Sequence, residues 1–205
     1  MENKIKIAVL VSGGGTNLQA LIDAQKKGII KAGEISLVIS NNKDAYALER
    51  AKNNGIKSVA IVKKDFGGDQ KAFENEIINQ LEKHDIKLIV LAGFLAILSQ
   101  DFTQKYANRI INVHPSLIPA FCGKGYYGLK VHEEALKKGV KVTGATVHFV
   151  NEIPDGGEII AQKAVAIRKF DTPESLQKRV MEKAEWKILP KATQDVAKKL
   201  LLESK

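Results

Sequence analysis

"IKIAVLVSGGGTNLQALID", residues 5–23, joins a continuous apolar run to three glycines and then to a helical pattern. The apolar run, Ile5–Val11, is rich in β-branched residues and is typical of a strand buried on both faces. After the glycines, Leu18, Leu21 and Ile22 fall on one face of a helix. This order of strand, glycines and helix predicts an α/β fold built on a parallel sheet.

The same alternation continues along the chain and then changes. We expect further strands at residues 35–40, 58–62, 88–94 and 109–113, with helices at 17–28, 44–55 and 69–84. Strands that alternate with helices favour right-handed crossovers and a doubly wound, mostly parallel, Rossmann-like sheet. The apolar runs at 142–150 and 158–167 are separated by a linker too short for a helical crossover, so we expect an antiparallel strand pair there.

The C-terminal stretch after this pair has a helical pattern. Thr172 is expected to cap its first turn, and Pro190 is expected to kink or split the helix. Asp44 is expected to cap the helix at 44–55. The sequence of 205 residues shows no repeat, low-complexity segment or evident linker. It therefore predicts a single domain over residues 1–205.

Composition and charge narrow the possible functions. The net charge of +9 comes from lysines scattered along the chain rather than from a basic block, which argues against a nucleic-acid partner. No apolar run approaches the roughly 18 residues that cross a bilayer, and no signal-peptide cleavage site follows the N-terminus. We therefore expect a cytoplasmic protein without membrane contact. Cys122 is the single cysteine, and no Cys/His spacing predicts a disulfide or a metal site.

The three glycines, residues 13–15, predict an anion site. A strand that passes through glycines into a helix directs free backbone N–H groups and the positive end of the helix dipole at an anion. Thr16 and Asn17 can cap this helix and donate to phosphate oxygens. No lysine follows the last glycine, as a P-loop requires, and Leu18 stands where a dinucleotide fingerprint has its third glycine. A phosphomonoester such as a ribose 5-phosphate fits better, and a tight turn without ligand is the alternative.

A second candidate site begins at "INVHPSLIP", residues 111–119. If the strand continues to His114, the side chains of Asn112 and His114 project from the same face at the carboxyl end of a parallel strand. An amide there can donate to a developing oxyanion, and an imidazole can move protons. Asp155, in the turn "IPDGGEI", is a candidate to orient the imidazole. Alternatively, His114 ends a strand and Asp155 only shapes a turn.

Two other histidines are weaker candidates. His148 alternates within the predicted strand 142–150 and is consistent with a satisfied histidine of the core or the sheet. His132 follows the glycine-rich "CGKGYYGLK" and either lines the pocket or caps a helix.

Four stretches together resemble one enzyme family. They are "KIAVLVSGGGTNLQAL", "VLAGFLAILS", "INVHPSLIP" and "GATVHFVNEIPDGGEIIAQKAV", and they are similar to the glycinamide ribonucleotide formyltransferases. The resemblance extends from Ile5 to about Pro190. Asn-x-His-Pro-Ser-Leu with a later Asp-Gly-Gly is the pattern of the wider folate-dependent superfamily. The loop Ser-Gly-Gly-Gly-Thr-Asn is the pattern of the glycinamide ribonucleotide branch.

The resemblance implies a fold, an activity and a co-substrate. The fold is formyltransferase-like, and the activity is transfer of the formyl group of 10-formyltetrahydrofolate to the amine of glycinamide ribonucleotide. This is a step of one-carbon metabolism in purine biosynthesis that needs no metal or nucleotide cofactor. The two small molecules are the partners that it implies, and it leaves the oligomeric state open.

The resemblance also implies roles for individual residues. Asn112 would bind the formyl oxygen, His114 would act as a general acid, and Asp155 would tune His114. Glu185 resembles an acid that contacts the ribonucleotide. The residues implied to hold the substrate phosphate are Gly15, Thr16 and Asn17. The residues implied to contact the folate are Gln70, Leu95, Ala96, Ile97, Leu98 and Asn112.

The sequence departs from the family pattern at several positions. Ala96 stands where an arginine is common, and Gln70 lies near a position that is often basic. How the glutamate tail of the folate is held therefore stays open, with three lysines as candidate replacements: Lys63, Lys64 and Lys71. Trp186 stands where a histidine is usual, and the loop "FCGKGYYG" is longer than in some relatives.

Three alternative functions remain. A formyltetrahydrofolate deformylase would replace the amine with water, but that family usually has an additional N-terminal domain. A methionyl-tRNA formyltransferase would need a C-terminal RNA-binding domain. A phosphosugar-binding protein without catalysis would use only the glycines. We expect the transferase, because the first predicted strand begins at Ile5 and the chain ends soon after the resemblance does.

Overall fold

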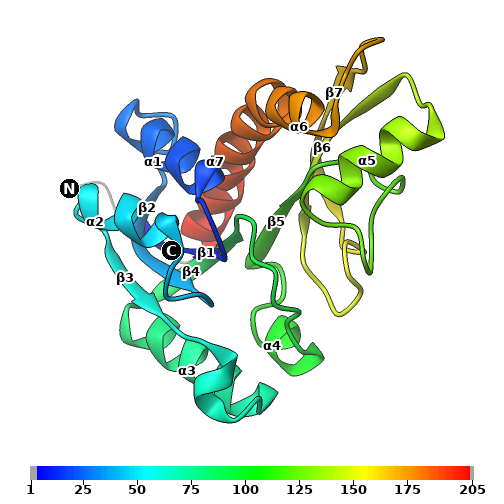
Figure 1. Cartoon of the computed structure of the whole chain (residues 1–205). Helices are drawn as coiled ribbons and strands as arrows, with labels where there is room; N and C mark the ends of the chain where they lie inside the picture. The colour runs from blue at the N-terminus through cyan, green and yellow to red at the C-terminus, as the bar shows by residue number, and fades with distance from the viewer. Residues whose placement is uncertain (1–3, 204–205) are drawn as a thin grey trace.

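The computed structural model describes residues 4–203 and contains a mixed sheet with helices on both faces (Figure 1). The strands are β1 (Ile5–Val11), β2 (Gly33–Ser40), β3 (Lys57–Ala60), β4 (Ile86–Leu91), β5 (Ile110–His114), β6 (Val142–Phe149) and β7 (Ile159–Ala166). The helical segments are α1 (Thr16–Lys26), α2 (Tyr46–Asn53), η1 (Lys63–Phe66), α3 (Gln70–Lys83), α4 (Gln100–Lys105), α5 (Leu129–Lys138), α6 (Pro173–Val180), η2 (Met181–Glu185) and α7 (Trp186–Glu203).

The strands lie in the order β3-β2-β1-β4-β5-β6-β7. Neighbours from β3 to β5 pair in parallel, and β6 is antiparallel to both β5 and β7. The predicted α/β class, the doubly wound and mostly parallel sheet and the antiparallel β6–β7 pair are therefore confirmed, as is a helical tail.

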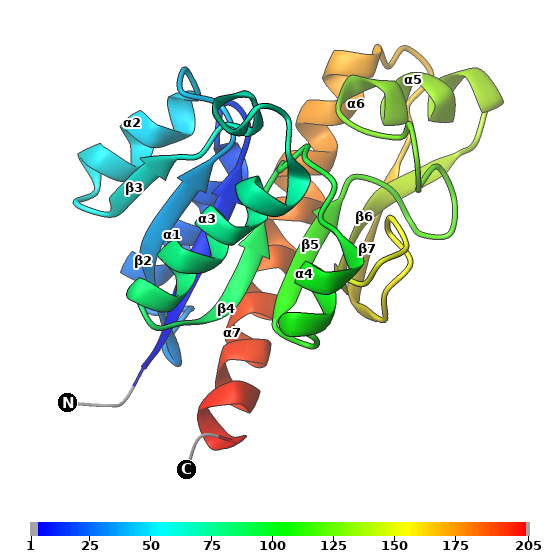
Figure 2. The same ribbon diagram turned by 90° about the horizontal axis from the view of Figure 1, so that it is seen from below.

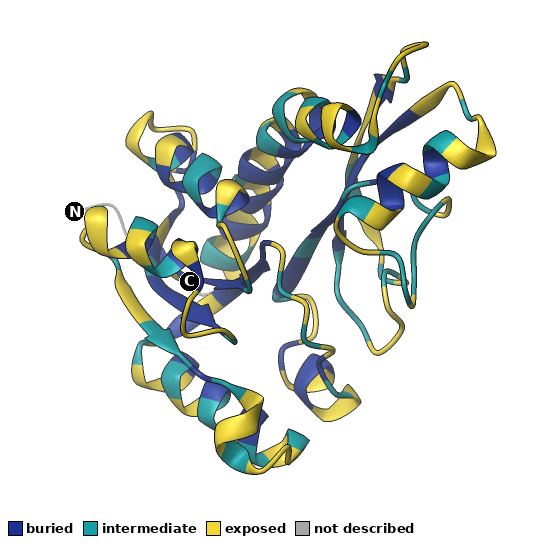
Figure 3. Cartoon of the chain, viewed as in Figure 1, coloured by how far each residue is buried: buried dark blue, intermediate teal, exposed yellow. Residues whose placement is uncertain are grey.

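Side chains that alternate along the strands belong to two separate hydrophobic cores, one on each face of the sheet. Helices α1, α2 and α7 pack on the face that includes Ile7, Val9 and Val11 of β1. Helices α3 and α4 pack on the opposite face, which includes Ala8 and Leu10. Figure 2 shows α3 and α4 in front of the sheet and α7 behind it. The central strands are accordingly buried along most of their length (Figure 3), as the continuous apolar runs require.

The topology creates a crevice at one edge of the sheet. Strand β1 lies between β2 and β4, so the crossovers from β1 and from β4 leave toward opposite faces. In open α/β sheets this switch point, at the carboxyl ends of the strands, is where ligands bind. The segments that follow β1, β4 and β5 all begin at this edge, and they contain most of the predicted site residues.

Two predicted helix caps are wrong. Asp44 is not a cap, because α2 begins one residue later than expected and its N-cap is Ala45. Thr16 and Asn17 do not cap α1, because Gly15 occupies the N-cap position in a left-handed conformation. The predicted cap at Thr172 is present, and its hydroxyl accepts from the Ser175 N–H.

The helical tail is split, but the break lies before Pro190. The tail passes from α6 into a π-helical turn, η2, and Pro190 lies inside α7. A proline cannot donate to the carbonyl four residues earlier, but α7 continues through Pro190 to Glu203. Within residues 4–203, no helix is long and apolar enough to cross a membrane.

Candidate active site

The glycine loop, residues 13–15, is held by α2. The Ala47 N–H donates to the Gly13 carbonyl at 3.1 Å, and Arg50 Nε donates to the Gly14 carbonyl at 2.8 Å. Gly15 has a φ of 70°, and a Cβ there would lie 2.7 Å from the Ala47 Cβ. Only glycine therefore fits between this turn and α2. Arg50 lies outside the residues predicted from the sequence, and it places a positive charge beside the predicted anion site.

The side chains that follow the glycine loop contact the helical tail. Asn17 Nδ2 donates to Glu185 Oε2 at 2.6 Å, and Thr16 Oγ1 lies 3.7 Å from Met181 Sδ. Glu185 is almost completely buried. Burial raises its pKa to about 7, although the hydrogen bond from Asn17 opposes the increase. The predicted phosphate-binding residue Asn17 and the predicted substrate-binding residue Glu185 thus meet where η2 contacts the start of α1.

The wall segment, residues 95–98, follows β4 at the same edge of the sheet. The Leu95 N–H donates to Ser12 Oγ at 2.8 Å, which ties this segment to the glycine loop. Gln70 Nε2 donates to the Ile97 carbonyl at 3.1 Å from α3. Leu95 is 60% exposed and Ile97 is 67% exposed, whereas Leu98 is buried. Exposed apolar side chains beside a polar crevice provide a surface suited to a flat, mostly apolar ligand.

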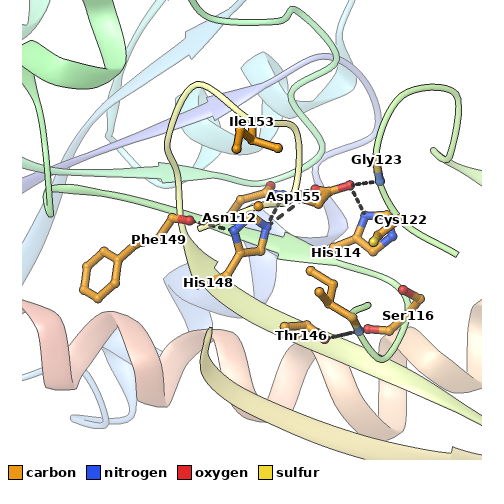
Figure 4. Close-up of polar contacts among 12 residues, drawn as sticks. Asn112, His114, Ser116, Cys122, Gly123, Thr146, His148, Phe149, Ile153 and Asp155 are labelled. Carbon is orange, nitrogen blue, oxygen red and sulfur yellow. Dashed lines mark hydrogen bonds and ion pairs between the residues drawn. The ribbon is translucent and has the colours of Figure 1, made fainter. Parts of the chain in front are cut away.

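The Asn–His–Asp cluster (Asn112, His114 and Asp155) lies beyond the wall segment. His114 Nδ1 is 3.4 Å from Asp155 Oδ2, and Asn112 Nδ2 is 3.5 Å from Asp155 Oδ1. Asn112 and His114 are two residues apart on β5, so both reach the same carboxylate. Figure 4 shows Asp155 between the two histidines, His114 and His148. The structure therefore brings Asp155, which the sequence placed on a separate turn, to the two side chains that it placed on one strand.

His148 is a member of this site that sequence reasoning missed. Its Nδ1 donates to the Phe149 carbonyl at 2.7 Å, and its Nε2 lies 3.2 Å from Asn112 Nδ2 and 3.5 Å from Asp155 Oδ1. The antiparallel register places Asn112 directly opposite His148. The alternation along β6 indicated which face of the sheet His148 lies on. It could not indicate that His148 lies beside Asn112, because that depends on the register between β5 and β6.

The loop around residues 121–123 also contacts the Asn–His–Asp cluster. The Phe121 carbonyl accepts from His114 Nε2 at 2.8 Å, and the Gly123 N–H donates to Asp155 Oδ2 at 2.8 Å. Phe121 and Asp155 have positive φ angles of 51° and 58°, which is unusual for residues other than glycine. Cys122 lies between these contacts, and its Sγ is 3.2 Å from the Pro119 carbonyl.

Burial and hydrogen bonds shift the two titrating groups. Burial lowers the pKa of His114 below its ordinary value, while Asp155 and the Phe121 carbonyl act in the opposite direction. Burial alone would raise the pKa of Asp155, but contacts with His148, His114 and Gly123 outweigh it and hold that pKa below its ordinary value. The cluster thus contains an ionised carboxylate beside an imidazole, an arrangement suited to proton transfer and to stabilising an imidazolium.

The comparisons with known proteins agree with this geometry. A family model described as formyl transferase matches residues 5–193. This chain belongs to the formyl transferase family.

Individual relatives of this formyl transferase point to one branch. A phosphoribosylglycinamide formyltransferase of Haemophilus influenzae is 44% identical over 185 residues, which cover 90% of this chain and 84% of the relative. A chloroplastic enzyme of the same name from Arabidopsis thaliana is 40% identical and is covered over 60% of its length. The human trifunctional purine biosynthetic protein adenosine-3 is 43% identical and is covered over 19% of its length. The chain thus spans between a fifth and three fifths of some curated relatives.

Solved structures extend the comparison to three dimensions. The structure of glycinamide ribonucleotide transformylase 1 from Symbiobacterium toebii superposes with a TM-score of 0.89 at 38% identity, and covers 97% of this chain and 90% of that chain. The resemblance to the glycinamide ribonucleotide formyltransferases, which are also called phosphoribosylglycinamide formyltransferases, is therefore confirmed.

His132 has an unusual environment in this formyl transferase. It lies in α5 and is fully buried, so it does not cap the helix. Neither ring nitrogen has a hydrogen-bond partner among the described residues. Burial lowers the pKa of His132 to about 4, and the nearby His114 adds to this effect. His132 is therefore a neutral neighbour of the site. Across residues 4–203, no cluster of three or more His, Cys, Asp or Glu side chains could hold a metal ion.

Proposed function

We propose that this formyl transferase transfers the formyl group of 10-formyltetrahydrofolate to the primary amine of glycinamide ribonucleotide. The observation that carries the proposal is the meeting of the Asn–His–Asp cluster at the sheet edge that also holds the glycine loop. One site can then receive a phosphorylated amine and an acyl donor at the same time. The family and its branch support the same choice of substrates.

The ribonucleotide phosphate binds at the glycine loop. Backbone N–H groups at the start of α1 point toward this site, and the dipole of that helix favours an anion there. The cation of Arg50 contributes to the local positive potential. Glu185 and Asn17 lie on the side of the loop that faces the tail, where they are placed to contact the sugar. The phosphate thereby fixes the distance from the loop to the reacting amine.

The folate binds against the wall segment, and its formyl group extends toward the cluster. The exposed side chains of Leu95 and Ile97 supply apolar contact for the pterin, and backbone groups of the segment supply hydrogen bonds. Ala96 stands where an arginine is common in the family, and Gln70 lies near a position that is often basic. Contact with the glutamate tail therefore depends on other cations, for which Lys63, Lys64 and Lys71 remain the candidates.

The reaction is acyl transfer. The substrate amine attacks the formyl carbon and forms a tetrahedral oxyanion, to which Asn112 and the protonated His114 donate. The bond from the formyl carbon to N10 of the folate then breaks, and the proton released by the amine passes to N10. Asp155 stabilises the imidazolium during this exchange. In the structure, His114 Nε2 donates to the Phe121 carbonyl. This hydrogen bond must break before Nε2 can donate to the substrate.

A turnover assay tests the proposal directly. Purified protein is incubated with 10-formyltetrahydrofolate in the presence and absence of glycinamide ribonucleotide. We expect tetrahydrofolate to appear only with the amine present, in equal amount with formylated ribonucleotide. Release of formate without the amine would instead identify a deformylase, and tight binding of the ribonucleotide without turnover would identify a binding protein.

The cytoplasmic location stays a prediction, since one relative is named as chloroplastic.

A further inference from the structure

Glu74 is a buried carboxylate outside the Asn–His–Asp cluster. It lies on α3, is 5% exposed, and belongs to none of the sets of residues implied by the family resemblance. Along the described chain, no Lys, Arg or His side chain lies within ion-pair distance of it. A buried carboxylate without a cation is costly unless hydrogen bonds compensate for the lost water. Its partners therefore indicate what the carboxylate is for.

All of these partners lie at or beside the wall segment. Glu74 Oε1 accepts from the Ser99 N–H at 2.6 Å and from Gln70 Nε2 at 2.6 Å. Glu74 Oε2 accepts from the Ser99 hydroxyl. Gln70 in turn donates to the Ile97 carbonyl at 3.1 Å. The carboxylate thus holds the end of the wall segment directly through Ser99 and indirectly through Gln70.

We propose that Glu74 is a positioning residue that fixes the wall segment in its folate-binding conformation. The opposite end of the segment is tied to Ser12 at the glycine loop, so the stretch is suspended between two anchors. Between these anchors Leu95 and Ile97 stay largely exposed. Apolar side chains collapse onto a core unless the backbone holds them away from it. This inference rests on the proposed function for the identity of the ligand, but not for the anchoring itself.

The anchoring also has a consequence for Gln70. Both hydrogens of its amide nitrogen are engaged, one by Glu74 and one by the Ile97 carbonyl. The side chain of Gln70 therefore has no N–H left to donate to a carboxylate of the folate tail. Its part in folate binding is to support the wall segment rather than to contact the tail. Glu74 and Gln70 act as one unit, with Glu74 as the acceptor on which it depends.

The substitution Glu74→Gln tests the proposal because it keeps the shape of the side chain. Its amide nitrogen would face donors instead of accepting from them, so at least one of the contacts with Ser99 or Gln70 is lost. We expect the KM for 10-formyltetrahydrofolate to rise about tenfold, with kcat and the KM for the ribonucleotide within about twofold of the wild type. This split is the pattern of lost uniform binding to one substrate.

The matched control is Glu76→Gln, two residues further along α3. Within residues 4–203, the side chain of Glu76 hydrogen-bonds only to side chains of its own helix, Asn79 and Gln80, so we expect unchanged kinetics. Should Glu74→Gln fold poorly, Gln70→Met removes only the indirect link, and a rise of about threefold in the folate KM is expected. Equal kinetics in Glu74→Gln and wild type would overturn the proposal. A fall in kcat together with a similar rise in both KM values would also overturn it, since that pattern reports general damage.

Hydrogen exchange separates this proposal from the proposed function. The amides of residues 95–99 are expected to exchange faster in Glu74→Gln than in wild type, while those of β4 stay unchanged. A wild type without turnover would reject the proposed function, and the exchange result would still decide the anchoring. Unchanged exchange at residues 95–99 in the variant would reject the anchoring, whatever the activity.

Discussion

The glycine loop and the Asn–His–Asp cluster lie at the same edge of the sheet but are assembled in opposite ways. The loop is made of consecutive residues between β1 and α1, and the binding groups that we propose for it are backbone N–H groups. The cluster joins side chains from β5 and from the turn before β7, with Asn112 and Asp155 separated by 43 positions in the sequence. The local sequence determines the first, whereas the register of the sheet determines the second.

This difference sets how each region responds to substitution. A site of backbone groups loses little when a supporting side chain is removed, because the helix still directs its N–H groups outward. A site of side chains loses the reacting group itself. We therefore expect the largest effects in the cluster, smaller effects in its buried support, and the smallest at the loop and the tail.

Substitution within the cluster is the most severe test of the comparison. Asp155→Asn removes the negative charge beside His114 but keeps the shape, and we expect kcat to fall by about 10²–10³-fold with an unchanged melting temperature. His114→Ala should lose at least as much. The control is Glu152→Gln, an exposed acid in the same turn. Turnover near wild type in Asp155→Asn would remove the cluster from the mechanism.

Replacement of His148 asks whether the cluster extends across the strands. His148→Gln removes the imidazole nitrogen that faces Asn112 and Asp155. We expect a fall of about tenfold in kcat, which corresponds to roughly one hydrogen bond that orients Asn112. The measurement is steady-state kinetics together with a thermal melt. If kcat stays unchanged while the melting temperature falls, His148 serves only packing.

At the glycine loop, Arg50→Ala tests how far support from a side chain matters. The variant loses the bond to the Gly14 carbonyl and the nearby positive charge. We expect the KM for the ribonucleotide to rise about fivefold at low salt, with kcat unchanged, because a surface charge contributes modestly. Lys52→Ala, an exposed cation on the same helix, is the control. An effect as large as that of Asp155→Asn would contradict the comparison.

The tail should affect the pH dependence of stability, because it contains the buried Glu185. Burial raises the pKa of Glu185 to about 7 in the folded protein, above its ordinary value near 4.3 when unfolded. The folded state then binds more protons, so this group stabilises the protein fully below about pH 4. That contribution is lost as the pH rises through about 7. The loss is at most about 1.4 kcal/mol for each pH unit.

The corresponding variant is Glu185→Gln, which cannot titrate. We expect its free energy of unfolding in urea to change less between pH 5 and pH 7.5 than that of the wild type. Asn17→Ala should increase the dependence on pH, because the hydrogen bond that opposes the shift is removed. Parallel curves for Glu185→Gln and wild type would mean that Glu185 is ionised in the folded protein.

The sequence predicted the regular part of this molecule well because burial imposes a period on it. Continuous apolar runs identified the strands, and the short linker before Glu158 identified the antiparallel pair. Short elements were harder to predict. The expected helix start at Asp44 was wrong, since Ala45 caps α2 without a side-chain contact. The helices α4 and α5 lie outside the predicted elements, and α4 has only 6 residues in which a helical period could show.

Within the site, the contacts that could not be predicted depend on pairing between distant segments. His148 entered the cluster through the β5–β6 register, which no local pattern encodes. Arg50 reached the glycine loop because α2 crosses beside it. The contact between Asp155 and His114 was a hypothesis about space that only the folded arrangement could supply.

The π turn η2 constrains how many residues separate α6 from α7 more than it constrains which residue types stand there. A turn with one residue more than an ordinary α-helical turn shifts the angular phase of everything that follows. Deletion of one residue from Met181–Glu185 would rotate α7 by about 100° relative to α6. Leu189, Thr193 and Val196, now buried, would swing away from the sheet. Insertions and deletions are thus far less tolerable here than in a surface loop, and a natural variant with a changed length at this point would need a second compensating change nearby.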